Sequence, residues 1–63
     1  MKKVFEDSSN EEVEMVAYVT TDNLLLIEIE DRSNTDYSQP IFLTKEEAVL
    51  FRNELTRILR YDF

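Results

Sequence analysis

The sequence predicts an α+β fold: an antiparallel meander of three to four strands with one C-terminal helix packed on one face. Over residues 13–20 and 24–30 an apolar residue occupies every second position, Val13 to Val19 in the first segment and Leu25 to Ile29 in the second, which is the period of strands with one buried face. A helix-start signal at residue 44 then precedes apolar residues at helical spacing up to about residue 60. The expected order is (β)-β-β-β-α, in a single small domain spanning residues 1–63.

The register of the central hairpin follows from the length of its turn, Thr21-Asp22-Asn23. A three-residue turn pairs Val19 with Leu25, and the apolar faces of the two strands then agree. A two-residue turn would place acidic side chains on the core face, because a slip of one residue turns every side chain over. Three-residue turns end on a left-handed residue, and Asn is the best choice there after Gly. We therefore expect Asn23 to be left-handed.

The remaining segments before the helix are shorter or more polar. Residues 2–6 are expected to form a short edge strand, and residues 7–12 a polar loop. A second polar loop of about nine residues is expected over 31–39, followed by a short strand at 40–43. Pro40 would start that strand, where the missing N–H is tolerated.

Thr44-Lys45-Glu46-Glu47 matches a capping box. In this motif the Thr44 hydroxyl accepts from the Glu47 amide, while the Glu47 carboxylate accepts from the Thr44 amide. The helix is expected from about 45 to 60. Its predicted buried stripe consists of Ala48, Phe51, Leu55, Ile58 and Leu59.

Composition restricts the chemistry that is available. A chain of 63 residues buries too little surface to be more than marginally stable alone. It has no Cys and no His, which argues against disulfides and zinc sites and leaves a second subunit as the remaining means of stabilisation. It has no Gly, which argues against Gly-rich phosphate loops. We therefore expect no enzymatic activity and no catalytic, cofactor-binding or metal-binding residues.

The net charge of −7 opposes direct binding to nucleic acid or to anionic membranes, because both require a basic face. It suits a basic protein partner or simple solubility. No apolar run approaches the ~20 residues of a membrane span. The first residues become acidic at Glu6 and lack the apolar region of a signal peptide, so a cytoplasmic location is expected.

The sheet face away from the helix should be polar in a simple monomer. On the predicted register it instead carries five apolar residues, which suggests a protein interface: Val16, Tyr18, Leu24, Leu26 and Phe42. The alternative is that this face is covered by the chain itself, either by Val4 and Phe5 or by Phe63.

The same face is expected to carry an acidic patch of Glu14, Glu28 and Glu30, with Glu14 directly opposite Glu30. Like charges in this arrangement are destabilising. The patch could receive a basic partner, hold a cation through oxygen ligands, or form a solvated strand end.

Three functions fit these expectations. The first is a protein–protein interaction module, a small homodimeric regulatory or adaptor protein. The second is an acidic inhibitor that mimics nucleic acid and binds the basic groove of a nucleic-acid-handling protein. In size, charge and layout the chain has a general similarity to phage-encoded anti-defence proteins of that kind. The third is one subunit of a hetero-oligomer. The acids are spread over loops, strands and the helix start rather than set in one row, which favours the first function.

Overall fold

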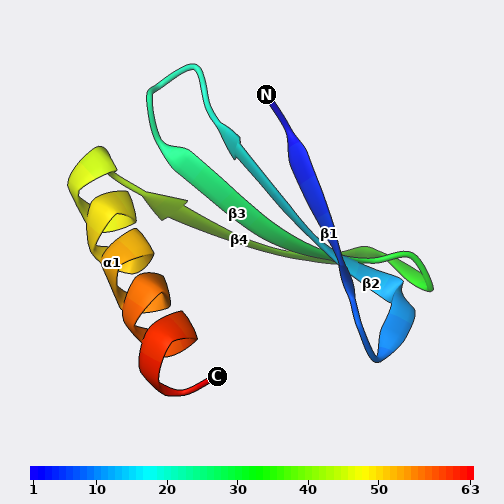
Figure 1. Cartoon of the computed structure of the whole chain (residues 1–63). Coiled ribbons are helices and arrows are strands. Elements are labelled where there is room, and N and C mark those ends of the chain that lie inside the picture. The colour runs from blue at the N-terminus through cyan, green and yellow to red at the C-terminus, as the bar shows by residue number, and fades with distance from the viewer.

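Four strands and one helix make up the chain in the computed structural model, which describes the backbone of residues 1–63 and the side chains of residues 1–34 and 38–63. The elements are β1 (Lys3–Asp7), β2 (Asn10–Val19), β3 (Leu25–Asp31), β4 (Asn34–Leu43) and α1 (Lys45–Tyr61). The strands are antiparallel neighbours in the order β1-β2-β3-β4, and α1 follows at the end (Figure 1). The predicted meander with a C-terminal helix is confirmed.

The turn between β2 and β3 has the predicted length and shape. Asn23 has a φ of 62°, and its N–H donates to the carbonyl of Thr20 over 3.0 Å. The N–H of Thr20 donates to the carbonyl of Leu24 over 2.8 Å, which closes the hairpin. Val19 therefore pairs with Leu25, so the predicted register is confirmed along both strands.

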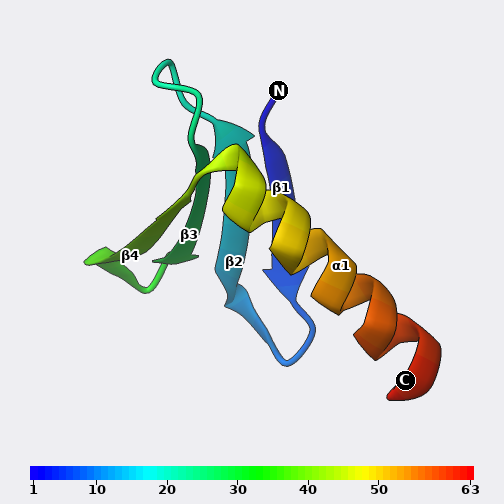
Figure 2. The same cartoon turned by 90° about the vertical axis from the view of Figure 1, so that its left-hand side faces the viewer.

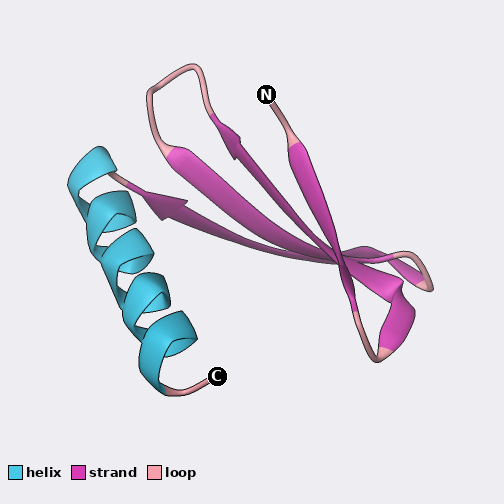
Figure 3. Ribbon diagram, viewed as in Figure 1, coloured by secondary structure: helices cyan, strands magenta, loops and turns pink.

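The prediction of a polar loop on either side of this hairpin is wrong. Each is a tight turn, with Ser8-Ser9 joining β1 to β2 and Arg32-Ser33 joining β3 to β4 (Figure 3). β4 therefore begins at Asn34 and takes in residues that were expected to be loop. Polar residues fit this strand because it lies at the edge of the sheet, and the edge position also accommodates Pro40 inside the strand rather than at its start.

Both tight turns have the sequence Asp-x-Ser-Asn, and local hydrogen bonds explain why they form. Asp7 Oδ1 accepts from the N–H of Ser9 over 2.7 Å and from its hydroxyl over 2.6 Å. Asp31 Oδ1 accepts from the N–H and hydroxyl of Ser33 over 2.9 and 2.6 Å. A side chain that bonds the backbone two residues on stabilises a turn without Gly.

The start of the helix is as predicted. The Thr44 hydroxyl accepts from the Glu47 N–H over 3.2 Å, and the Glu47 carboxylate accepts from the Thr44 N–H over 2.9 Å. The helix ends at Tyr61, where Asp62 donates its N–H to the carbonyl of Ile58 over 2.9 Å. Among the described residues, no helix has both the length and the apolar character needed to cross a membrane.

The helix crosses one face of the sheet without closing onto it. It begins at the end of β4 and runs diagonally in front of the other strands (Figure 2), while a side view shows its C-terminal half diverging from the sheet (Figure 1). Its contacts with the sheet are mainly to β4. All its side chains are described, and none of them is buried. The expected burial of the helix stripe is therefore wrong for the isolated chain.

The capping box makes Thr44→Ala a test of the helix start. Loss of the hydroxyl leaves the Glu47 N–H without its acceptor, so the free energy of unfolding should fall by about 1 kcal/mol in a urea titration. Thr44→Ser keeps the acceptor and should stay close to the parent chain. Equal stability of the Ala and Ser variants would contradict the role of this cap.

Asn23 allows a second test, of the left-handed turn. Asn23→Ala should lose about 1 kcal/mol of stability, because a Cβ-bearing residue without a local polar group is disfavoured at this φ. Asn23→Gly should equal or exceed the parent. Unfolding should be compared at one protein concentration, because association would shift the midpoint. A stable Ala variant would mean that the turn does not require the left-handed residue.

Candidate interaction surface

The sheet face toward α1, here called the inner face, is apolar across all four strands. Its apolar members are Phe5 of β1, Val13, Met15, Ala17 and Val19 of β2, Leu25, Ile27 and Ile29 of β3, and Ile41 and Leu43 of β4. The strand register places these residues opposite one another. All ten are half-buried or exposed, so the helix leaves much of this face open to water.

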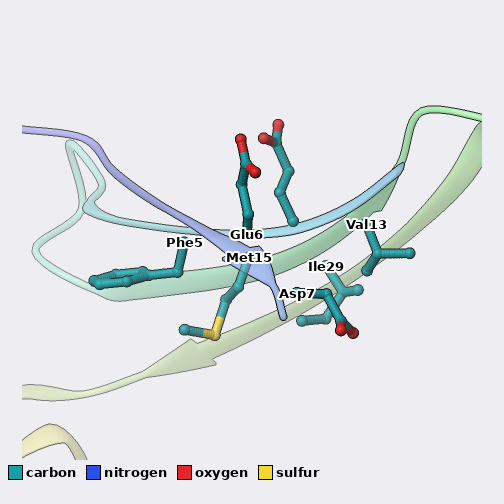
Figure 4. A pocket seen from close by; sticks show the side chains of 7 residues that line it. Phe5, Glu6, Asp7, Val13, Met15 and Ile29 are labelled. Atoms are coloured by element: carbon teal, nitrogen blue, oxygen red, sulfur yellow. The ribbon is translucent and has the colours of Figure 1, made fainter. Parts of the chain in front are cut away.

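A groove lies between the inner face and the helix. A hollow of about 380 Å³ is lined by sheet residues and by one helix residue, namely Met15, Ile27, Ile29, Gln39, Ile41, Leu43 and Phe51. Met15 and Ile29 also line a second hollow of about 200 Å³, which extends toward Phe5 and Val13. Figure 4 shows the side chains of Phe5, Val13, Met15 and Ile29 on one side of the sheet, with Glu6 on the other. The two hollows are therefore neighbours that share Met15 and Ile29, and the second is also bordered by three acidic residues, Glu6, Asp7 and Glu14.

The apolar stripe of the helix is also open to water. Ala48 is half-buried near the start of the helix, and Phe51 lines the groove. Farther along, Leu55 and Ile58 are each 41% exposed, and Leu59 is more exposed still. The five residues predicted to form a buried stripe thus lie on an apolar surface that continues from the inner face. We call this stripe and the inner face together the open apolar surface.

The accessible area shows how much surface is left uncovered. A compact monomer of 7.5 kDa should expose about 4,250 Å². The chain exposes 5437 Å², an excess of about 1,200 Å². A stable protein–protein contact buries about 800 Å² on each partner. The excess is therefore large enough to form one complete interface.

The opposite face, here called the outer face, differs from the expectation of an exposed patch. Val16 is 1% exposed and Leu26 is 6% exposed, and they are the two buried apolar side chains among the residues whose side chains are described. Both lie on the two central strands of the sheet, so each has a cross-strand neighbour on either side. Val16 lies between Val4 and Glu28, and Leu26 lies between Tyr18 and Phe42. These neighbours shield the two side chains, so the expected exposure of Val16 and Leu26 is wrong.

Three members of the predicted interface remain accessible. Tyr18 and Leu24 are half-buried, and Phe42 is exposed. Their part in an interface stays a prediction. The alternative, that the chain ends cover this face, holds only at Val4, which lies beside Val16 in the sheet; Phe5 is on the inner face, and Phe63 is almost fully exposed.

The predicted acidic patch lies on the outer face, and its register is confirmed. Glu14 is paired with Glu30 on one side and with Glu6 on the other. Sequence reasoning missed Arg32, which lies 3.4 Å from the Glu14 carboxylate and 3.6 Å from that of Glu6. Its backbone N–H also donates to the Glu12 carbonyl over 2.7 Å. Arg32, in the turn between β3 and β4, therefore reduces the electrostatic repulsion among Glu6, Glu14 and Glu30.

Glu28, the third member of the patch, accepts a hydrogen bond from the Ser38 hydroxyl. It lies beside Val16 and Pro40 in the sheet, one row away from Glu14 and Glu30. Among the described residues, no group of three or more His, Cys, Asp or Glu side chains is arranged to hold a metal ion.

The two Asp-x-Ser-Asn turns lie at one end of the sheet and alter the titration of their aspartates. The hydroxyl and then the N–H of Ser9 stabilise the ionised carboxylate, which lowers the pKa of Asp7 below 3.8. Ser33 lowers the pKa of Asp31 in the same way. Each ionised aspartate stabilises the folded state, and this contribution is complete when the pH is above the aspartate's ordinary pKa. The contribution is lost as the pH falls through the lowered pKa of the folded state.

The paired turns supply their own control for a titration experiment. Ser33→Ala removes the Ser33 hydroxyl, which lowers the pKa of Asp31 more than the Ser33 N–H does. The pKa of Asp31 should therefore rise toward 3.8, while that of Asp7 stays unchanged. Carboxyl-carbon NMR shifts measured across the acidic range would follow both groups in one sample. Equal behaviour of Asp31 in the variant and the parent would show that the hydroxyl does not set its pKa.

Comparisons with protein-family models, with curated proteins and with solved structures found no match for this chain.

Proposed function

We propose that this chain is a non-enzymatic protein–protein interaction module that acts as a homodimeric regulatory or adaptor protein. The observation that carries the proposal is the exposed area, about 1,200 Å² above that of a compact monomer. The open apolar surface contributes to this exposed area on both the sheet and the helix. Covering it in a dimer supplies the stabilisation that a chain of this length lacks.

The surface chemistry also supports a binding role over a catalytic one. The groove is lined by aliphatic side chains, one Phe and one Gln, and none of these groups transfers protons or acts as a nucleophile. The lowered pKa values of Asp7 and Asp31 belong to exposed turns, and their hydrogen bonds to Ser9 and Ser33 give them a structural role.

An acidic inhibitor of a nucleic-acid-handling protein is the second candidate. The row of Glu6, Glu14 and Glu30 across three strands supports it. Arg32 counts against it, because a cation within 4 Å of two of these carboxylates weakens the resemblance to a phosphate chain. The homodimeric module is the better-supported function.

Ile58→Glu should weaken the dimer strongly. It places a charge on the open apolar surface at a position already 41% exposed, so the isolated chain should tolerate it, whereas an uncompensated charge in an interface should raise the dissociation constant at least about tenfold. Light scattering after gel filtration over a wide concentration range would measure the mass. The parent should stay near twice 7.5 kDa, and the variant should fall to one chain on dilution.

Leu50→Glu is the matched control. Leu50 is 64% exposed and lies roughly opposite the helix stripe, so the same chemical change there should leave the dimer intact. Circular dichroism should show the same helix content in the parent and both variants. A parent chain that is monomeric at every concentration would refute the proposed function.

A further inference from the structure

We propose that the C-terminal half of α1 from a second copy fills the groove between α1 and the inner face, so that the two helices pair in antiparallel orientation through their apolar stripes. The inference rests on the proposed homodimer and assigns how its two chains meet. Each chain would insert Leu55, Ile58 and Leu59 into the groove of the other. A two-fold axis would cross the helix pair near the middle of each helix.

The shape of the groove supports this arrangement. The first turns of α1 approach their own sheet, because Ala48 is half-buried and Phe51 shares a hollow with Met15 and Ile27. The later turns of the helix diverge from the sheet (Figure 1), and Leu55 and Ile58 on these turns are each 41% exposed. In an antiparallel pair, the C-terminal half of one helix lies beside the N-terminal half of the other. It would therefore reach the groove where Phe51 forms one wall.

The charges along the helix favour an antiparallel pair. The first turn carries Lys45, Glu46 and Glu47, with two acids to one base, whereas the rest of the helix carries Arg52, Arg57 and Arg60 with one acid, Glu54. Antiparallel pairing sets the acidic start of each helix beside the basic end of the other. Parallel pairing would set like charges together. The helix macrodipoles also oppose one another favourably in the antiparallel arrangement.

The charge of the whole chain favours a helix as the occupant over a second sheet. Residues 1–44 contain ten acidic and three basic side chains, whereas residues 45–61 contain three acidic and four basic ones. Sheet-to-sheet pairing would bring two strongly negative segments together. Helix-to-sheet pairing joins a slightly positive segment to a negative one, which lowers the electrostatic opposition to self-association.

Cross-linking between single-cysteine variants tests the arrangement, because the chain has no native Cys. Leu55→Cys is mixed with Ile41→Cys, and in a separate sample with Phe42→Cys, and each mixture is treated with a short bismaleimide. Ile41 and Phe42 are adjacent and nearly equally exposed, at 52% and 54%, but they lie on opposite faces of the sheet. The Ile41 mixture should give at least about tenfold more mixed cross-linked dimer than the Phe42 mixture.

The remaining outcomes separate this inference from the proposed function. A dimeric mass with no preference for Ile41, or with cross-linking through Phe42, overturns the helix exchange and leaves the homodimer standing. A monomeric mass, with the double variant Leu55→Cys/Ile41→Cys cross-linking within one chain, overturns both, because α1 would then close on its own sheet. Light scattering on the same samples supplies the mass.

Discussion

The three-residue turn between β2 and β3 is the constraint on which the rest of the chain depends. The left-handed backbone of Asn23 sets the pairing of Val19 with Leu25, and every later residue of the two strands inherits its face from that pair. The register thereby separates two kinds of surface. Apolar side chains collect on the inner face, while Glu14, Glu28 and Glu30 collect on the outer face.

This separation creates an imbalance that one helix cannot correct. Four strands offer an apolar face wider than a single helix covers, and α1 meets the sheet mainly along β4. Burial is consequently deepest where cross-strand neighbours shield one another, at Val16 and Leu26 on the outer face, rather than under the helix. A chain with so little burial is marginal by itself, so the same surface that leaves the monomer weak is the one best suited to a partner.

Two local features could be predicted from the sequence, whereas most of the differences arise where a feature depends on neighbours in space. The capping box at Thr44 and the turn at Asn23 are set by a few adjacent residues. The Asp-x-Ser-Asn turns are equally local, and the repeat of that pattern at residues 7 and 31 was a readable signal that the loop interpretation overlooked. The shielding of Leu26 by Tyr18 and Phe42 could not be predicted from the sequence, because it depends on how the flanking side chains fill space. The divergence of α1 from the sheet is likewise a tertiary property that helical periodicity does not encode.

A chain with a net charge of −7 is an unusual candidate for self-association, and the placement of its charges resolves the difficulty. Repulsion between exposed charges fades beyond a screening length of about 8–10 Å in physiological salt, so the local charge at the contact matters more than the total. Glu14, Glu28 and Glu30 lie on the outer face, where Arg32 pairs with Glu6 and Glu14, and the helix carries a slight positive excess. An interface built from the inner face and α1 therefore keeps these outer-face carboxylates at a distance from the contact. It also leaves the acidic outer face free on both chains, so that self-association and the capture of a basic partner would use opposite sides of the same sheet.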